Sequence, residues 1–207
     1  AATLTPSEFA RLHRNQWSAS SEAFIPPEWW DRCKVELEPM DRRSVVIGLD
    51  AAVENDCFAV VVVSMSKSGK PQVRYCRIWT PPPNGQIKFA EIENELLRLF
   101  SVYNVAEVAY DPYQMASMSQ RLSGNVFWNP FAQGSSRLVA DKMLFDLIRD
   151  RRIEHDGSFP ELRQHIINAD RKPEDDKLRL IQRVQSQKID AAVALSMACN
   201  RALYYNL

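Results

Sequence analysis

The chain has no excess of charge of either sign, because 26 Lys and Arg residues balance 26 Asp and Glu residues. It therefore has no long-range field to attract a polyanion, and any contact with nucleic acid must come from a local group of cations. It also lacks the run of about 20 apolar residues that a membrane-spanning helix needs. The opening stretch AATLTPSEFARLHRNQW lacks the apolar core of a signal peptide. We therefore expect a cytoplasmic location and no membrane partner.

Cysteine is scarce, and its spacing excludes the common zinc patterns. No CxxC pair occurs, and the three histidines are not near the cysteines at zinc-ligand spacing. We expect reduced cysteines that fill the core. Apolar residues make up 45% of the 207 residues and charged residues 25%, which is typical of a soluble globular protein with one main domain.

The first forty residues differ from the rest. Thr5-Pro6-Ser7-Glu8 is a capping box that predicts a short helix through Arg14, and Pro27 predicts the start of a second one. Four large aromatic residues of this region need a surface to pack on: Trp17, Phe24, Trp29 and Trp30. We therefore divide the chain into an extension over 1–40, docked on a main domain over 41–207.

From Val45 the pattern becomes regular. Apolar β-branched runs at 45–49 and 58–63, followed by an alternating run at 72–79, predict three successive antiparallel strands. An amphipathic helix, with Phe89, Ile92, Leu96 and Leu99 on one face, then leads to a strand at 105–110. Further elements are expected at 112–122 (helix), 125–128 (strand), 136–150, 160–168 and 189–204 (helices). By analogy, this order is that of an α/β ribonuclease H-like mixed five-stranded sheet flanked by helices.

Two aspartates end neighbouring strands of this predicted sheet. The helical crossover returns the chain to the first strand, so Asp50 and Asp111 become neighbours. Each has a structural alternative. Asp50 is also suited to a turn, and Asp111, which precedes Pro112, is also a typical helix N-cap.

A third aspartate, Asp190, opens the closing helix. Val193, Ala194 and Met197 share its helical face, which suggests that the carboxylate points into the domain. The alternative is a first-turn acid favoured by the helix dipole. Three converging carboxylates repel one another unless a multivalent cation neutralises them, and oxygen ligands suit Mg²⁺ or Mn²⁺. Two such ions would support hydrolytic phosphoryl transfer.

Three segments carry a resemblance to a known family. GLDAAVENDCFAV, AYDPYQ and KIDAAVALSMA, in this order, resemble the acidic motifs of the nuclease domain of tailed-bacteriophage large terminase subunits. RLHRNQW and FIPPEWW also resemble the segment by which those proteins leave their ATPase domain, so the likeness covers nearly the whole chain.

The resemblance implies a metal-dependent endonuclease that cuts concatemeric double-stranded viral DNA during genome packaging. Asp50, Asp111 and Asp190 would be catalytic and would bind two Mg²⁺ or Mn²⁺ ions. Asp56, Asn168 and Lys188 are outer-shell candidates, although Asp56 is equally suited to a turn.

The same resemblance implies a context in the cytoplasm of an infected bacterial host. The partners would be double-stranded DNA, the ATPase domain of the same polypeptide, the small terminase subunit and the portal. No GxxxxGK[ST] motif occurs, so the ATP-driven motor is missing, and we expect an excised C-terminal domain.

Local cations could supply DNA contacts. Arg151 and Arg152 in the run RDRR, and Lys188, are the candidates, and the mixed-charge stretch 171–183 is a further one. The alternative for each of these segments is an ordinary solvated face.

Two rival functions remain open. An actin-like ATPase domain also opens with such a strand and a hairpin, but it needs glycine-rich phosphate loops, and only six glycines are present. A non-catalytic docking module of a packaging motor would use the aspartates as helix caps and would show no metal-dependent stabilisation.

Overall fold

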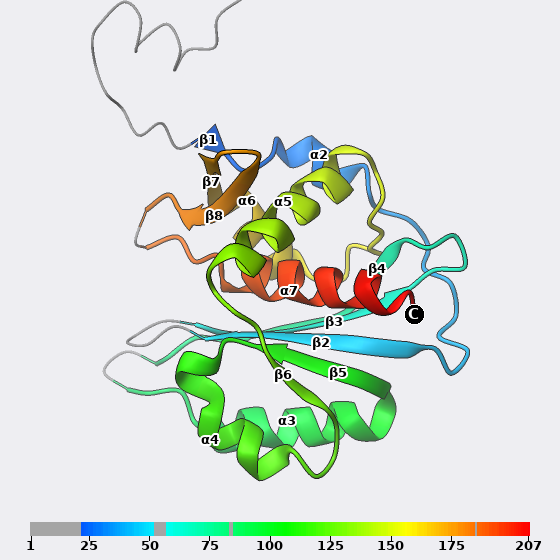
Figure 1. Ribbon diagram of the computed structural model, residues 1–207, viewed down its shortest axis with the longest axis vertical. Helices are drawn as coiled ribbons and strands as arrows, with labels where there is room; N and C mark the ends of the chain where they lie inside the picture. Colours follow the sequence, from blue (N-terminus) through cyan, green and yellow to red (C-terminus); the bar gives the residue numbers. More distant parts are fainter. Residues whose placement is uncertain (1–21, 52–56, 83–84, 185) are drawn as a thin grey trace, which may run out of the picture.

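The central sheet has five strands in the order β4-β3-β2-β5-β6 (Figure 1). The computed structural model describes residues 22–51, 57–82, 85–184 and 186–207. Strand β3 (Phe58–Met65) is antiparallel to both β2 (Ser44–Ala51) and β4 (Pro71–Trp79), while β5 (Asn104–Tyr110) is parallel to β2 and to β6 (Trp128–Pro130). The predicted mixed five-stranded α/β sheet is confirmed.

Helices cover both faces of the sheet, which explains why every residue of β3 is buried. Val45, Ile47 and Leu49 of β2 belong to the core below the sheet in Figure 1. That core also contains buried residues of α3 (Phe89–Val102) and α4 (Pro112–Leu122). Val46 points to the opposite face, where α7 (Asp190–Tyr205) lies.

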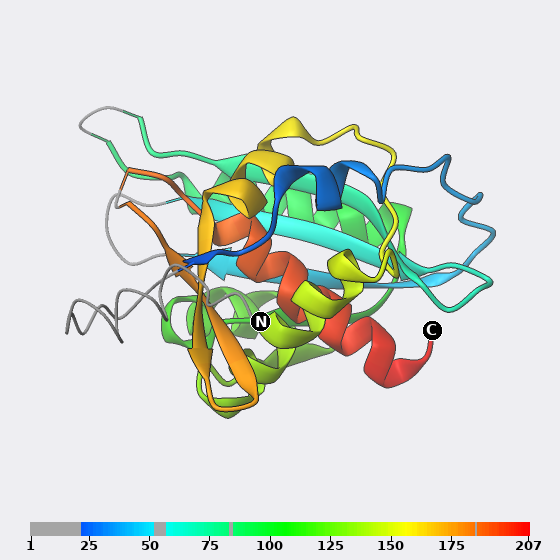
Figure 2. The ribbon, with the colours of Figure 1, turned by 90° about the horizontal axis from the view of Figure 1, so that it is seen from above.

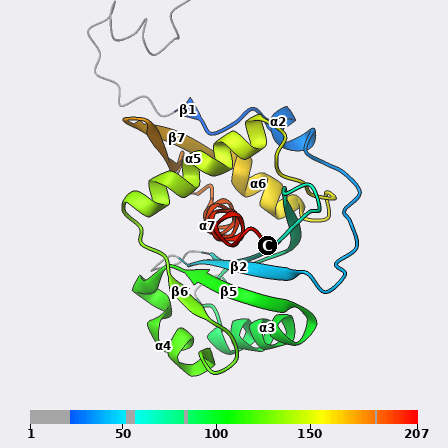
Figure 3. The ribbon, with the colours of Figure 1, turned by 45° about the vertical axis from the view of Figure 1, so that its right-hand side comes forward.

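Helix α7 lies between the sheet and an outer helical layer. Figure 3 shows it nearly end-on, with the sheet on one side and α5 (Ser135–Arg149) and α6 (Pro160–Asn168) on the other. Most of its residues are buried, including all ten from Asp190 to Cys199. A helix that is apolar nearly all round suits this central position.

Gly48 allows α7 to approach the sheet closely. A Cβ atom at this position would lie 2.0 Å from the carbonyl oxygen of Ala194 and 3.1 Å from the Cβ of Ala198. Only a residue without a side chain fits beneath the helix backbone, so Gly48 fixes where α7 crosses β2.

A second, smaller sheet was not predicted. Strands β1 (Glu22–Ala23), β7 (Ala169–Glu174) and β8 (Lys177–Gln182) pair in the order β1-β7-β8, and Figure 2 shows the β7–β8 hairpin in orange. The mixed-charge stretch 171–183 is therefore largely a hairpin. Its turn contains Asp175 at φ 55°, and Leu178 and Leu180 are buried on one side of β8.

The described part of the N-terminal extension packs into the main core. Phe24, Ile25, Trp30 and Cys33 share one cluster with residues of α5, α6 and α7. Helix α2 (Pro27–Asp31) begins at the predicted proline. The expected helix through Arg14 lies outside the described residues. None of the helices in the described ranges is both long and apolar enough to cross a bilayer.

Two predicted details were wrong. Phe89, expected on the buried face of α3, is 46% exposed because it is the first residue of the helix. The strand expected at 125–128 begins only at Trp128, since the preceding residues form a turn.

Gly48→Ala should destabilise the protein strongly, because the added methyl overlaps a helix carbonyl that cannot move without shifting α7. We expect a loss of about 3 kcal/mol, near the upper end of the usual cost of overpacking, in the free energy of unfolding measured by denaturant titration. Gly124→Ala is the control, because a Cβ at that position meets nothing within 4 Å. Equal stabilities for the two variants would contradict the close contact.

Candidate active site

Asp50 and Asp111 lie side by side at the carboxyl ends of two parallel strands. Leu49 of β2 pairs with Tyr110 of β5, so the two aspartates are the next residues along each strand. Both follow residues of the α7 face, since Gly48 meets α7 and Ala109 packs with Val193 and Met197 of that helix. Because side chains alternate between faces, these carboxylates belong to the α7 side of the sheet.

Asp190, at the start of α7, lies on the same face of the sheet as Asp50 and Asp111. Helix α7 crosses β2 at Ala194, and Asp190 lies one helical turn before that contact, as Asp50 lies two residues beyond Gly48. Each step is about 6 to 7 Å, so both aspartates lie on the same side of the point where α7 crosses β2. Asp190 is the first residue of α7 and is only 5% exposed.

An ion pair fixes the other end of α7 against β5. The buried carboxylate of Glu107 accepts two hydrogen bonds from Arg201, at 2.7 and 2.9 Å, and others from Asn129 and Tyr205. Burial alone raises the pKa of Glu107, but these hydrogen bonds hold it below its ordinary value. Contacts at both ends therefore set the rotation and register of α7 over the sheet.

The electrostatics of Asp50 match a crowded carboxylate site. The pKa of its carboxyl is raised to about 8, and burial is the largest cause. Within this net shift, the guanidinium of Arg137 lowers the pKa, and the carboxylates of Asp190, Asp111 and Asp141 raise it. The negative charges of Asp190 and Asp111 therefore act on Asp50 in the same direction as its burial.

Asp111 is also the N-cap of α4, which is the structural alternative expected from the sequence. Its Oδ1 accepts a hydrogen bond of 2.9 Å from the backbone N–H of Tyr113, which caps α4. Capping uses one carboxylate oxygen and fixes the side chain, so it is compatible with a second role for the other oxygen.

Two residues of α6 hold the start of α7. The side-chain amide of Asn168 donates to the backbone carbonyl of Lys188 at 3.0 Å, and Nδ1 of His165 accepts from the backbone N–H of Ala191 at 3.1 Å. Asn168 thus lies in the predicted neighbourhood of Asp190 and acts there on the backbone. His165 was not predicted, because a lone histidine in a helix carries no distinctive pattern.

A buried ion pair within α5 was also not predicted. Arg137 Nε donates to Asp141 Oδ1 at 2.7 Å, and both side chains are almost completely buried in α5. The spacing of four residues was a usable signal for a helical ion pair.

The remaining predicted residues lie elsewhere. Asp56 lies outside the described residues. Arg151 and Arg152 are exposed and follow the C-terminal end of α5, whereas Arg137 near its beginning interacts with Asp50. The length of α5 separates them from the aspartates by about 20 Å.

The donor set suits a hard divalent cation, because carboxylate oxygens are the ligands that Mg²⁺ and Mn²⁺ prefer. In the part of the chain that the structure describes, no three Asp, Glu, His or Cys side chains are grouped closely enough to hold one ion as they stand. Metal binding would therefore require carboxylate side chains to rotate towards one another.

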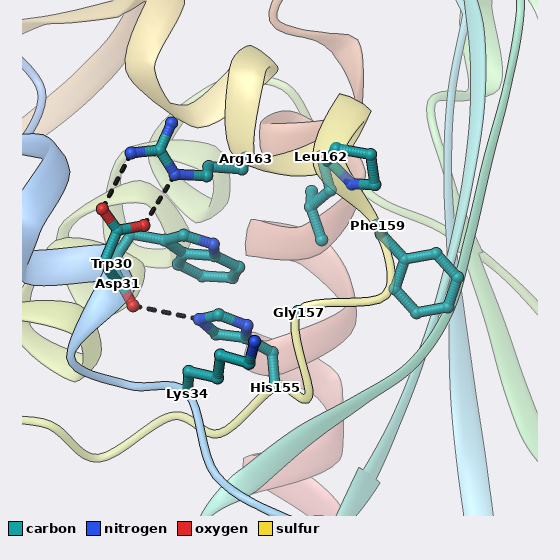
Figure 4. Close-up of a pocket in the computed structure, with 9 residues that line it drawn as sticks. Trp30, Asp31, Lys34, His155, Gly157, Phe159, Leu162 and Arg163 are labelled. Atoms are coloured by element: carbon teal, nitrogen blue, oxygen red, sulfur yellow. Dashed lines mark hydrogen bonds and ion pairs between the residues drawn. The ribbon is translucent and has the colours of Figure 1, made fainter.

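A separate pocket of about 280 Å³ lies between α2, α6 and the segment that precedes α6 (Figure 4). Its lining includes the stacked rings of Trp30 and His155, with centroids 4.2 Å apart, and the ion pair of Asp31 with Arg163. It contains none of the predicted aspartates. Since its carboxylate is already paired with arginine, it offers no comparable cation site.

The raised pKa of Asp50 predicts how the free energy of unfolding of the metal-free protein depends on pH. An unfolded aspartate has a pKa of about 3.9, whereas that of folded Asp50 is about 8. Below about pH 3.9 the carboxyl is protonated in both the folded and the unfolded protein, so its ionisation does not affect stability. Between the two pKa values the unfolded state ionises more readily, so the free energy of unfolding should fall as pH rises. Asp50→Asn should therefore show a flatter profile in chelator and exceed wild type by at least about 1 kcal/mol at pH 8.

The control is Asp175→Asn, which changes an exposed turn residue that tolerates asparagine. Denaturant titrations from about pH 5 to 8 measure the effect. Parallel curves for wild type and Asp50→Asn would contradict it.

Comparisons with known proteins agree with the architecture. Among curated proteins, the gene 13 protein of Mycobacterium phage L5 is 28% identical over 222 residues, which cover 93% of this chain and 37% of that protein. The HK97 bacteriophage large terminase superimposes with a TM-score of 0.78 at 20% identity, covering 94% of this chain and 46% of that one. This chain thus spans less than half of either protein.

A shorter structure aligns over nearly its whole length. The large terminase nuclease from thermophilic phage G20c, crystallised with bound magnesium, superimposes with a TM-score of 0.60 at 13% identity, covering 87% of this chain and 97% of that one. At such identities the likeness shows the fold, which is ribonuclease H-like. The family model of the terminase large subunit, endonuclease domain, matches residues 77–205, more than half of the chain. The chain therefore belongs to the terminase large subunit endonuclease family.

Proposed function

We propose that this chain is a divalent-metal-dependent endonuclease that cuts concatemeric double-stranded viral DNA during genome packaging. The observation that supports the proposal is that Asp50 and Asp111 end neighbouring parallel strands on the face of the sheet where α7, which begins with Asp190, packs. Family membership supports the same activity.

The three aspartates would hold Mg²⁺ or Mn²⁺. Related nucleases from phage G20c have been crystallised with magnesium and with cobalt, which supports a divalent ion. When bound, two such ions would supply an activated water and would stabilise the leaving oxygen of a phosphodiester.

The protein's own residues would prepare this site in three ways. The capping bond to Tyr113 fixes the Asp111 carboxylate, and Asn168 and His165 fix the backbone on both sides of Asp190. The raised pKa of Asp50 shows that negative charge is costly there, and this cost favours a cation. Lys188, two residues before the start of α7, remains a candidate phosphate contact.

The substrate and partners are part of the proposal. We infer double-stranded DNA as substrate and an ATPase domain of the same polypeptide as partner. The large terminase of another thermophilic bacteriophage has been crystallised with ATP-γ-S, and this chain covers only 48% of it. The small terminase subunit, the portal and the cytoplasm of an infected host complete the proposed context.

Cutting of supercoiled plasmid tests the proposed activity. Wild type should nick and linearise plasmid with Mn²⁺ or Mg²⁺ and should be inactive with chelator, and Asp→Asn at 50, 111 or 190 should lower the rate at least about 100-fold. Asp175→Asn is the matched control. Cutting that survives chelation, or full activity in all three variants, would contradict the metal site. Folded protein with neither cutting nor Mn²⁺ stabilisation would favour the docking module.

DNA binding should be weak and should fall steeply with salt, because the chain has no net charge and relies on local cations. Replacing Arg151 and Arg152 by Ala should lower affinity and reduce the slope of log affinity against log salt by about 1 to 2. Binding to short duplexes, followed by anisotropy from low to moderate salt, measures this. An unchanged slope would remove this pair from the DNA-binding surface.

A further inference from the structure

Asp141 is a fully buried carboxylate that joins three elements of the fold. Its Oδ1 accepts from Arg137 Nε of α5 at 2.7 Å and from Ser196 Oγ of α7 at 2.8 Å. Its Oδ2 accepts from the backbone N–H of Leu180 in β8 at 2.9 Å. With bonds on both oxygens, the position and orientation of this carboxylate are fixed.

Its partner Arg137 is a buried cation next to the proposed metal site. The side chain is 8% exposed, and its Nη1 donates to Gln133 at 3.0 Å. This part of α5 packs beside the site, because Ala140 shares a cluster with Ala109 of β5 and Val193 of α7. In keeping with this packing, the guanidinium of Arg137 lowers the pKa of Asp50. The guanidinium therefore interacts with two aspartates, and it is hydrogen-bonded to Asp141.

The presence of an arginine at position 137 is not explained by a stabilising effect on helix α5. Arg137 is the third residue of the helix, where the helix dipole disfavours a cation. The order of the pair, cation before acid at a spacing of four, is also the weaker one for a helix. A buried ion pair is itself weak support for stability. The effect of Arg137 on the charge of Asp50 offers a better explanation for its position.

A buried guanidinium needs a carboxylate partner. If Asp141 carried no charge, Asp50 would be the nearby carboxylate best able to take its place. A guanidinium paired with Asp50 would occupy the oxygens that a divalent ion needs. The two cations would then compete for one ligand.

We propose that Asp141 is a positioning residue that retains Arg137 and so keeps Asp50 available for a divalent metal. This inference rests on the proposed function, because it requires Asp50 to be a metal ligand. Asp141 itself does not contact the metal or the substrate. Arg137 remains close enough to offset part of the carboxylate repulsion when no metal is bound.

The test is Mn²⁺ binding, measured directly from the electron paramagnetic resonance signal of free Mn²⁺. Asp141→Asn keeps an oxygen for the Leu180 N–H but loses the charge, and it should weaken Mn²⁺ binding at least about 10-fold. The double variant Arg137→Gln, Asp141→Asn removes the competing cation as well, and its affinity should return to within about 3-fold of wild type.

A matched control lies on the same helix. Lys142 and Asp146 form a pair with the same spacing and order on a more exposed part of α5, with Lys142 Nζ 2.5 Å from Asp146 Oδ2. Asp146→Asn should leave Mn²⁺ affinity unchanged. If Asp141→Asn binds Mn²⁺ like wild type, or if the double variant binds as weakly as Asp141→Asn, the retaining role is wrong.

Melts in chelator show whether each variant folds. If Asp141→Asn does not fold, the single variant Arg137→Gln tests the proposal. Removal of a cation beside Asp50 should tighten Mn²⁺ binding by about 3-fold or more. Weaker or unchanged binding in Arg137→Gln would then overturn the proposal.

Asp50→Asn separates this inference from the proposed function. If wild type and Asp50→Asn bind Mn²⁺ equally, the metal site and the role of Asp141 both fail. If Asp50→Asn loses binding while Asp141→Asn keeps it, the metal site stands and only the role of Asp141 fails.

Discussion

The close crossing of α7 over β2 is the constraint on which the rest of the structure depends. At Gly48 the helix backbone occupies the space that any side chain would fill. The pair of Arg201 with Glu107 fixes the other end of the same helix. Contacts at both ends leave α7 little freedom to slide or rotate, so Asp190 is held at the edge of the sheet where β2 and β5 end. The proposed chemistry follows from this packing.

The same packing creates an electrostatic problem. Bringing Asp190 to Asp50 and Asp111 gathers like charges at a partly buried position, and the pKa of Asp50 rises to about 8 as a result of burial and these neighbours. Such a site is unfavourable alone and favourable around a cation. In the proposed function, stability without metal would be given up for affinity towards metal, a trade that is typical of functional sites. Arg137 lowers the pKa of Asp50 and so moderates this cost, and in the role proposed above its ion pair with Asp141 would keep it from pairing with Asp50.

Local sequence signals predicted the sheet and the positions of the aspartates, because both depend on short-range periodicity. Apolar β-branched runs indicated the strands, and Pro112 and Asp111 marked the start of α4 to the residue. The β7–β8 hairpin escaped prediction because its mixed charges conceal the alternation of Leu178 and Leu180. The pair of Arg137 and Asp141 was also missed, since burial of an ion pair is decided by tertiary packing. The metal role of the three aspartates remains a prediction.

The most direct test of the central claim is a crystal structure of this chain grown with Mn²⁺, with the ion located by its anomalous scattering. The account predicts an anomalous peak at the carboxyl ends of β2 and β5, within ligand distance of carboxylate oxygens from Asp50, Asp111 and Asp190. A peak only at other side chains would contradict it. So would Mn²⁺-soaked crystals in which Asp190 points away from the other two aspartates and no ion lies between them.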